Sequence, residues 1–388
     1  MRTIYCDHNS TTRTDPRVAT AMQEVAVESF ANASSAHRLG QKARVRLDEA
    51  RAQVAACLGA KPSEIVFTAG GSESDNIAIL GSLMSPEARG RHMVTVKSEH
   101  PAVTVTVAWG AKQGFAVTLL GVDEFGRIDL DEFRDALRPD TQVATVMQAN
   151  NEIGTVYPIV ELSRIAHEQG VVFHTDAVQA YGKIPVNVNE LGVDLLSLSS
   201  HKFYGPKGFG VLYVRQGTRL APILHGGGQE LGRRPGTENV PGAVGTALAM
   251  QLCVSEADEM RRVTGITDEF RRLLPTLVDD IRVFGDPKSR LPNTVAVGFG
   301  GVDGESLSIA LDLRGICVST GSACHSGARE PSHVLKAMGI PLHFAIGSIR
   351  FSFGRESKAE DAQIIAQAVA EEVARLRAMA RTESAKAR

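Results

Sequence analysis

The sequence has few cysteines, and those it has form no recognisable framework. Five cysteines are scattered among 388 residues, at positions 6, 57, 253, 317 and 324, and no two of them make a CxxC pair. Secreted, disulfide-stabilised domains usually carry a dense and even set, so this odd count predicts a reducing compartment, the cytoplasm. We also expect no resident metal ion.

Long apolar runs and an excess of positive charge are missing too. No segment approaches the roughly 20 apolar residues that a membrane helix needs, and the N-terminus lacks the apolar stretch of a secretory signal. Lys and Arg total 42 against 44 for Asp and Glu, a formal net charge of -2. Because nucleic-acid and membrane-surface binders are normally basic, this balance predicts no direct contact with nucleic acid or membrane.

What is present, from about residue 64 to residue 214, is an alternation of two patterns. Helix-like stretches, the clearest at residues 159–169, separate short apolar runs that are typical of buried strands. These runs are residues 64–68, 92–97, 116–120, 143–147, 171–176, 193–199 and 210–214. The alternation predicts βαβ units, and therefore a mostly parallel sheet with helices on both faces. Such sheets bind ligands beyond the carboxyl ends of their strands, where we expect Thr68, Asn150, Asp176 and Ser199.

The remainder of the chain has fewer strand-like runs and more helical ones. Residues 241–274 have a helical pattern and suit a connector between two domains. Strand-like runs follow at residues 293–299, 316–319 and 349–352, and a long helix is expected from about residue 358. We therefore expect a second, smaller α+β domain, whose last residues, 378–388, are frayed.

One lysine stands in an unusual place. Lys202 follows the strand predicted at residues 193–199, among hydroxyl groups, His201 and glycines. A loop lysine is ordinarily solvated, whereas a lysine that forms a Schiff base must be desolvated to react. Asp176 ends another strand, and its carboxylate suits either a helix N-cap or the pyridinium nitrogen of pyridoxal phosphate. Gln179 can reach the same ligand.

Two further segments suit a phosphorylated aromatic ligand. Gly70, Gly71 and Ser72 form a glycine turn that opens a helix, where backbone N–H groups and the helix dipole favour phosphate. The turn matches neither the GxGxxG dinucleotide fingerprint nor the GxxxxGK[ST] loop. His100 stands where the next predicted strand ends. Its ring suits either structural hydrogen bonds or stacking on an aromatic cofactor.

Together with other motifs, these residues resemble the class V aminotransferase branch of the pyridoxal-phosphate enzymes of fold type I, and within it the cysteine desulfurases of the NifS/IscS type. The matching motifs follow one another in order along nearly the whole chain. They are residues 5–12 (YCDHNSTT), 32–37 (NASSAH), 67–76 (FTAGGSESDN), 98–100 (SEH), 150–154 (NNEIG), 174–179 (HTDAVQ), 199–202 (SSHK), 233–239 (RRPGTEN), 322–326 (SACHS), 330–333 (EPSH) and 348–354 (SIRFSFG).

The resemblance implies a two-domain α/β fold. The large, cofactor-binding domain would comprise residues 14–255, with a mostly parallel seven-stranded sheet flanked by helices. The smaller α+β domain would comprise residues 1–13 and 256–388 and carry Cys324.

The resemblance also implies roles for the cofactor-facing residues. Lys202 would bind pyridoxal 5'-phosphate covalently and later move protons, and Asp176 would pair with the pyridine nitrogen. Gln179 and Asn151 would bond near the phenolic oxygen of the ring. His100 would stack on the ring and act as an acid or base.

The same resemblance implies phosphate and substrate ligands. Arg350 and Asn151 would hold the carboxylate of the substrate, which a planar guanidinium suits. Thr237 would reach the phosphate of a neighbouring subunit, so we expect a homodimer. Within one subunit the phosphate ligands would be Gly71, Ser72, Ser199 and His201.

Cys324 indicates the reaction. It lies among small and polar residues, unlike Cys57 and Cys317, which have apolar neighbours typical of structural cysteines. An exposed thiol can enter the site as a thiolate and store sulfur as a persulfide. The resemblance therefore implies that L-cysteine is converted to L-alanine. Cys324 would pass the sulfur to an acceptor or Fe–S scaffold protein, for cluster assembly or for tRNA or cofactor thiolation, and could contact a cluster during delivery.

Two other interpretations use the same sequence. A selenocysteine lyase, or another class V enzyme acting on a small amino acid, would share this machinery. A catalytically idle sulfur-relay subunit would be expected to lack Lys202, Asp176 or Cys324, and all three are present. The chain departs from the family pattern at Pro235, and at Cys6 and His8 in the N-terminal motif.

Overall fold

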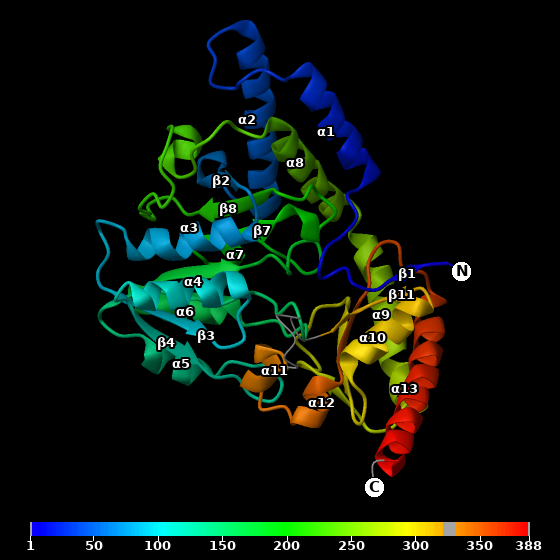
Figure 1. Cartoon of the computed structure of the whole chain (residues 1–388). Coiled ribbons are helices and arrows are strands. Elements are labelled where there is room, and N and C mark those ends of the chain that lie inside the picture. The colour runs from blue at the N-terminus through cyan, green and yellow to red at the C-terminus, as the bar shows by residue number, and fades with distance from the viewer. Residues whose placement is uncertain (1, 321–330, 387–388) are drawn as a thin grey trace.

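The computed structural model describes residues 2–320 and 331–386, and its largest element is a seven-stranded sheet (Figure 1). The strands lie in the order β2-β8-β7-β6-β5-β3-β4. β8 is antiparallel to both of its neighbours, and the other neighbouring pairs are parallel. The bounds are β2 (Ile65–Thr68), β3 (His92–Val96), β4 (Ala116–Leu120), β5 (Thr141–Thr145), β6 (Val172–Asp176), β7 (Leu195–Ser199) and β8 (Gly210–Val214). The predicted mostly parallel sheet is confirmed.

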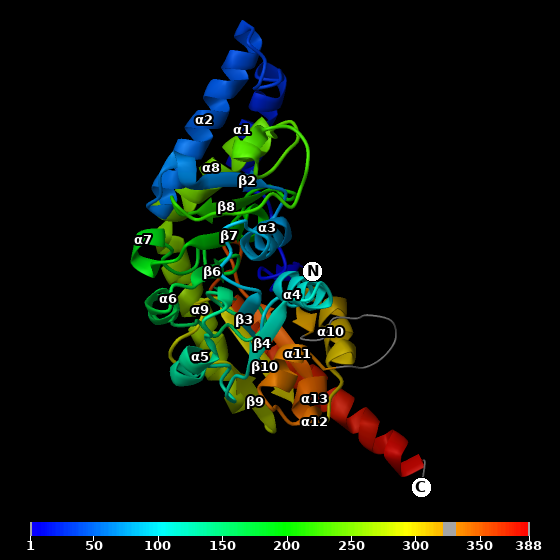
Figure 2. The same ribbon diagram turned by 90° about the vertical axis from the view of Figure 1, so that its left-hand side faces the viewer.

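Helices cover both faces of this sheet. α3 (Gly71–Leu83) and α4 (Pro101–Lys112) lie on one face, and α5 (Leu130–Ala136), α6 (Ile159–Glu168) and α7 (Val188–Leu191) lie on the other (Figure 2). Because both faces are covered, β3, β5, β7 and β8 are buried along their whole length. This burial explains the apolar runs of β3, β7 and β8, whereas β5 is equally buried with the more polar sequence TQVAT.

Three more helices pack beside the β2 end of the sheet. α1 (Pro16–Glu28) and α2 (Arg38–Leu58) precede the alternating region, and α8 (Val240–Ser255) follows it. Their apolar residues belong to the same core as the buried side chains of α6 and β7. Asp15 caps α1, and Gly59, with φ 71°, ends α2 in a left-handed conformation that suits glycine.

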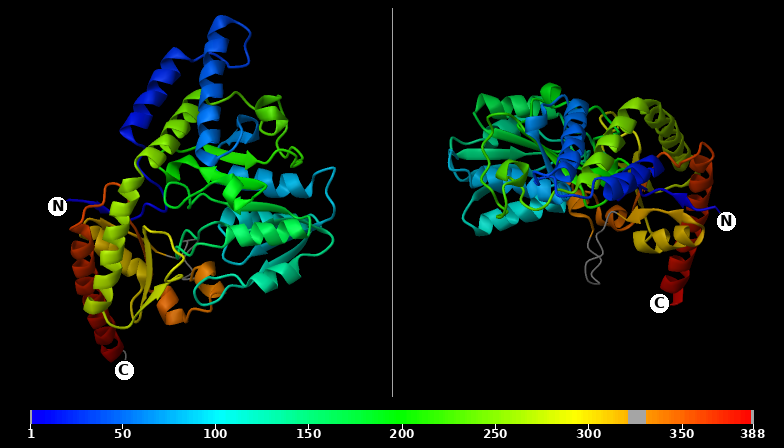
Figure 3. Two further views of the ribbon diagram at one scale, coloured as in Figure 1. Left: turned by 180° about the vertical axis from the view of Figure 1, so that it is seen from behind. Right: turned by 90° about the horizontal axis from the view of Figure 1, so that it is seen from above.

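A smaller unit with its own core follows in the chain. An antiparallel sheet in the order β12-β13-β10-β9 packs against α9 (Ala257–Leu277), α10 (Gly304–Leu313) and α13 (Asp361–Lys386), with α9 and α13 side by side (Figure 3). The strands are β9 (Ile281–Phe284), β10 (Thr294–Phe299), β12 (Ser319–Thr320) and β13 (Ser348–Ser352). Two short helices, α11 (His333–Ala337) and α12 (Leu342–Ile346), complete the unit.

Three sequence expectations need correction. The run predicted at residues 143–147 starts two residues earlier, because the polar Thr141 pairs with His92 of β3. The helical pattern at 241–274 comprises two helices that meet at Glu256. The C-terminus does not fray at residue 378, since α13 continues to Lys386. The domain limits proposed at residues 13 and 255 stay a prediction.

The N-terminal segment connects the two units. β1 (Ile4–Tyr5) pairs in parallel with β11 (Ile316–Cys317), and Asp7 bridges to Ser352 of β13. The chain then crosses to the large unit, where the N–H of Thr12 donates to the carbonyl of His201 at 3.0 Å. We call residues 7–12 the N-terminal strap. No helix within the described residues is long and apolar enough to span a bilayer.

Candidate active site

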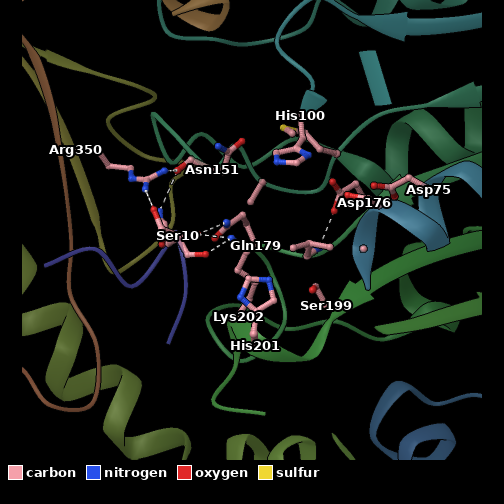
Figure 4. A pocket seen from close by; sticks show the side chains of 16 residues that line it. Ser10, Asp75, His100, Asn151, Asp176, Gln179, Ser199, His201, Lys202 and Arg350 are labelled. Carbon is pink, nitrogen blue, oxygen red and sulfur yellow. Dashed lines mark hydrogen bonds between the residues drawn. The ribbon is translucent and has the colours of Figure 1, made fainter. Parts of the chain in front are cut away.

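A cavity of about 420 Å³ opens where the strap meets the carboxyl ends of the large sheet (Figure 4). Arg350 and Asn151 lie at one end of it and Asp75 and Asp176 at the other. Ten of the predicted site residues line this cavity. They are Gly71, Ser72, His100, Asn151, Asp176, Gln179, Ser199, His201, Lys202 and Arg350. Residues predicted from separate motifs thus face one space.

Lys202 projects from a 3₁₀ turn, Ser200–Lys202, that directly follows β7. Its ammonium donates to the main-chain carbonyls of Asn9 and Ser10, both at 2.7 Å. Burial, with a smaller contribution from the Arg350 guanidinium, lowers the pKa of Lys202 to about 8. An amine with this pKa is partly neutral near physiological pH, as a nucleophilic lysine requires.

Asp176 ends β6 and is 5% exposed. One of its oxygens accepts the N–H of Val178 at 2.8 Å. Burial raises the pKa of Asp176, and the nearby His100 and Lys202 oppose this rise. Asp75 and Glu99 are also buried, and desolvation followed by the charge of Asp176 raises the pKa of each. Three buried carboxyl groups thus lie close together, and the ionised form of Asp176 is stabilised when a cation lies beside it.

The opposite wall of this end is suited to an anion. Gly70, with φ 156°, is the N-cap residue of α3. Because glycine has no side chain, it does not cap the first N–H groups of this helix. A Cβ on Gly71 would lie 2.8 Å from Val178 Cγ2, so any larger residue there would require Val178 to shift. Ser199 at the end of β7 and His201 complete the wall. Burial lowers the pKa of His201 to about 4.

His100 caps α4, with its Nδ1 accepting the N–H of Ala102 at 3.1 Å. This bond leaves Nε2 as the nitrogen available to other partners, and the ring lines the cavity (Figure 4). Burial lowers the pKa of His100, although Asp176 opposes the shift. The ring is therefore neutral at physiological pH unless a negative charge is added beside it.

Arg350 of β13 reaches the cavity from the small unit. Its guanidinium donates to Asn151 O at 2.8 Å, to Asp7 Oδ1 at 2.7 Å and to Ser10 Oγ at 2.7 Å. Its buried Nε has no partner among the residues that the structure describes. The side chain is 9% exposed, so a carboxylate that enters the cavity would meet a dry, oriented cation.

Three predicted positions lie elsewhere, and the position of a fourth is not described. Thr237 is exposed and does not line the cavity of its own chain. Cys324 lies outside the described residues. Thr68 and Asn150 were expected near the ligand, beyond the strand ends, but neither lines the cavity. Their side chains instead bond neighbouring segments: Thr68 Oγ1 bonds Ser74 Oγ at 2.7 Å, and Asn150 Nδ2 donates to Ser98 O at 2.9 Å.

Some lining residues had no predicted role. They are Asn9, Ser10, Asp75, Met147, Ala149 and Val178. Asp75 carried a usable signal, because it stands four residues after Gly71 and so follows the glycine turn by one helical turn. Asn9 and Ser10 belong to a motif that the sequence comparison matched, yet nothing local in the sequence shows which groups they face.

The cavity fits pyridoxal phosphate. Three features face one space. They are a buried carboxylate with no cationic hydrogen-bond partner among the described residues (Asp176), a glycine that opens a helix (Gly71) and a desolvated lysine (Lys202). These groups match a pyridinium nitrogen, a phosphate and an aldehyde, respectively.

Comparison with known proteins gives the family. Residues 4–365 match the aminotransferase class-V family. The chain is 48% identical over 361 residues to "Cysteine desulfurase IscS" of Dictyoglomus turgidum, covering 93% of this chain and 92% of that protein. A solved "NifS-like protein" superposes with a TM-score of 0.90 at 36% identity, over 96% of this chain and 99% of the other.

A second solved structure, "SspA in complex with cysteine", superposes with a TM-score of 0.81 at 36% identity, over 91% of this chain and 99% of the other. The relatives favour the cysteine desulfurases over the selenocysteine lyase interpretation. The chain therefore belongs to the class V aminotransferase family and, within it, to the pyridoxal-phosphate-dependent cysteine desulfurases.

Proposed function

We propose that this cavity desulfurates L-cysteine to L-alanine and that Cys324 receives the sulfur as a persulfide. The observation that carries the proposal is the meeting of Lys202, Asp176 and Arg350 around one cavity. The lysine and the aspartate suit the cofactor, and the arginine suits the carboxylate of an amino acid. The complex of a 36% identical structure with cysteine supports this substrate.

The geometry of the cavity supports the following roles toward the cofactor. Lys202 would bind it, Asp176 would keep its ring nitrogen protonated, and His100 would lie against its ring. The phosphate is held by Gly71, Ser72, Ser199 and His201. When bound, pyridoxal phosphate supplies an electron sink for the α-carbon of the amino acid.

The substrate is oriented and deprotonated by the chain. Arg350 and Asn151 would hold the α-carboxylate, while Gln179 would donate near the phenolic oxygen of the cofactor. Lys202 would remove the α-proton as a neutral amine. Its depressed pKa of about 8 makes that neutral form accessible.

The sulfur then moves to Cys324. The Cys324 thiolate attacks the sulfur of the substrate, an S–S bond forms and the Cβ–S bond breaks. The electron pair of the broken bond stays with the carbon skeleton, which takes up a proton and leaves as L-alanine. One L-cysteine and one Cys324 thiol thus give one alanine and one persulfide, with no external oxidant or reductant.

We infer that the enzyme works as a homodimer in the cytoplasm and delivers sulfur to an acceptor or Fe–S scaffold protein. Exposure of Thr237 outside its own cavity supports a role toward a second subunit. Leu231 in the same loop and Phe30 on the segment after α1 are each 71% exposed, which suits an interface. The IscS name of a 48% identical relative supports cluster assembly as the destination.

The test is a stoichiometry. The purified holoenzyme receives L-cysteine and a thiol reductant, and alanine and sulfide are quantified beside the Cys324→Ala variant. Equal amounts of alanine and sulfide from the wild type, and neither from the variant, are expected. A yellow wild-type protein that makes no alanine would contradict desulfuration, and an active variant would contradict the role of Cys324.

A further inference from the structure

A second lysine, Lys183, lies directly behind the cavity. Its ammonium donates to Gln179 Oε1 at 2.6 Å and to Asn9 Oδ1 at 2.9 Å, and both of those residues line the cavity. On its other side Lys183 lines a separate cavity of about 570 Å³ between the turn after β6 and α9. Across the two described stretches, no carboxylate lies within ion-pair distance of Lys183. Its only acceptors there are two neutral amide oxygens.

This contact determines the direction of the Gln179 amide. Burial, followed by the positive charges of Lys202 and Arg350, lowers the pKa of Lys183. Its nitrogen carries N–H groups whether it is charged or neutral, and in this contact it donates to the oxygen of Gln179. The amide nitrogen then points the other way and donates one N–H to Asn9 O at 2.8 Å. Its second N–H has no acceptor in the part of the chain that the structure describes and is left for the cavity. Lys183 thus converts an ambiguous amide into a fixed donor.

The second contact fixes the strap. Asn9 Oδ1 accepts from Lys183 and, at 3.2 Å, from Asn293 Nδ2. Asn9 Nδ2 is therefore turned the other way and donates to Thr294 Oγ1 at 2.9 Å and to Asn151 O at 3.2 Å. The main-chain carbonyl of Asn9 accepts from both Lys202 and Gln179. Lys183 therefore holds Asn9, whose carbonyl anchors the reactive Lys202. Through Asn9 it also acts on Asn151, whose carbonyl accepts from Arg350.

We propose that Lys183 is a positioning residue: it directs an N–H of Gln179 into the cavity and holds Asn9 against Lys202. The inference rests on the proposed function because it gives that N–H the phenolic oxygen of the cofactor as its acceptor. A donor placed on this oxygen stabilises it as an anion and so lowers the proton affinity of the cofactor bound to Lys202.

The charges around the two lysines give the direction of the expected effect. Burial and then the charges of Lys202 and Arg350 lower the pKa of Lys183, and burial and then Lys183 lower the pKa of His8. Lys202 faces Arg350 on one side and the carboxylates of Asp176 and Asp7 on the others. Loss of Lys183 removes a neighbouring donor and frees the Gln179 amide to rotate. Both changes favour protonation at Lys202.

The experiment is a pH titration of the yellow absorbance of the holoenzyme. In Lys183→Met the midpoint should move upward by roughly one pH unit, a tenfold change in proton affinity. The kcat/KM for L-cysteine should fall by roughly 10-fold to 100-fold, as expected when reacting groups are misplaced. In Lys183→Arg, which keeps donors for both oxygens, the midpoint should lie closer to the wild type.

Lys61→Met is the matched control. Lys61 also donates to a glutamine oxygen, that of Gln216 at 3.0 Å, but it is exposed and does not line the cavity. This variant should keep the wild-type midpoint and activity. If Lys183→Met does not fold, Lys183→Gln carries the same test, because it removes the cation and keeps a polar side chain.

Two results would overturn the inference: an unchanged midpoint in a yellow Lys183→Met protein, or an equal shift in the arginine and methionine variants. A wild type that is colourless and inactive would instead contradict the proposed function. The two failures are therefore distinguishable.

Discussion

The two walls of the active site are built in different ways. The strand ends of the large sheet supply Asp176, Ser199 and Lys202, each within a few residues of a buried strand. The N-terminal strap supplies Asn9 and Ser10, which belong to no helix or strand and depend on partners up to 343 residues away in the chain. The first wall carries the reactive groups, and the second holds them in place.

The difference shows where reactivity and orientation come from. Lys202 is desolvated by the large unit, but its ammonium is anchored only by strap carbonyls among the described residues. Arg350 likewise comes from the small sheet, and the strap residues Asp7 and Ser10 hold its guanidinium. Variants in the sheet-end wall should therefore abolish chemistry, whereas variants in the strap should change binding and proton affinity.

The largest effect is expected for Lys202→Ala. The variant loses the amine that binds the cofactor and moves the α-proton, so kcat should fall by roughly 10⁴-fold or more. The absorbance of lysine-bound cofactor should disappear at the same time. Activity within tenfold of the wild type would contradict the assignment of Lys202 as the reactive lysine.

Asp176→Asn should have the next largest effect. The amide cannot stabilise a protonated ring nitrogen as a carboxylate does, so kcat should drop roughly 10²-fold to 10³-fold. Steady-state kinetics at saturating cofactor measures this loss. Asp75→Asn is a useful comparison, because Asp75 lies in the same end of the cavity but its buried carboxyl has a strongly raised pKa. A larger loss in that variant would transfer the role to Asp75.

Asp7→Asn tests the strap. Hydrogen bonds to charged groups contribute about 1.5–3 kcal/mol, and this one orients Arg350. The KM for L-cysteine should rise roughly tenfold, while kcat changes by less than about threefold. An unchanged KM would show that Asn151 and Ser10 orient the guanidinium without Asp7.

The smallest effect concerns pH. In the cofactor-free protein the neutral form of Lys202 is the one that reacts, and its fraction rises with pH around the pKa of about 8. The rate at which the apoprotein captures pyridoxal phosphate should therefore be half-maximal near pH 8 and level off about one pH unit above it. Arg350→Leu removes a cation that lowers this pKa, so the midpoint should move upward. A midpoint that stays in place would argue that burial alone sets it.

The same contrast explains what could be predicted from the sequence. Most strands of the large sheet are buried, and the apolar runs and terminal polar residues of β6 and β7 are visible locally, as for Asp176 and Ser199. β9 was not predicted, because three of its four residues are only partly buried and Arg282 interrupts its apolar pattern. α1 and α2 were not anticipated because they lie before the region of alternating strands and helices.

The strap and the backing lysine show the limit of local patterns. Asn9 faces Lys183, Lys202, Gln179 and Thr294 at once, and only the fold brings these residues together. Lys183, seven residues after Asp176, reads in the sequence as an ordinary turn lysine. The motif resemblance included the N-terminal segment that lines the cavity, but it did not show which groups Asn9 and Ser10 contact.

The most direct test of the account is to follow the sulfur atom itself. The reduced holoenzyme is mixed with one equivalent of L-cysteine, without added reductant, and its mass and peptides are analysed after a single turnover. We predict one added sulfur atom on Cys324 and one equivalent of alanine, with both absent in Lys202→Ala. Alanine formed without sulfur on Cys324, or sulfur found instead on Cys6, Cys57, Cys253 or Cys317, would contradict the proposal.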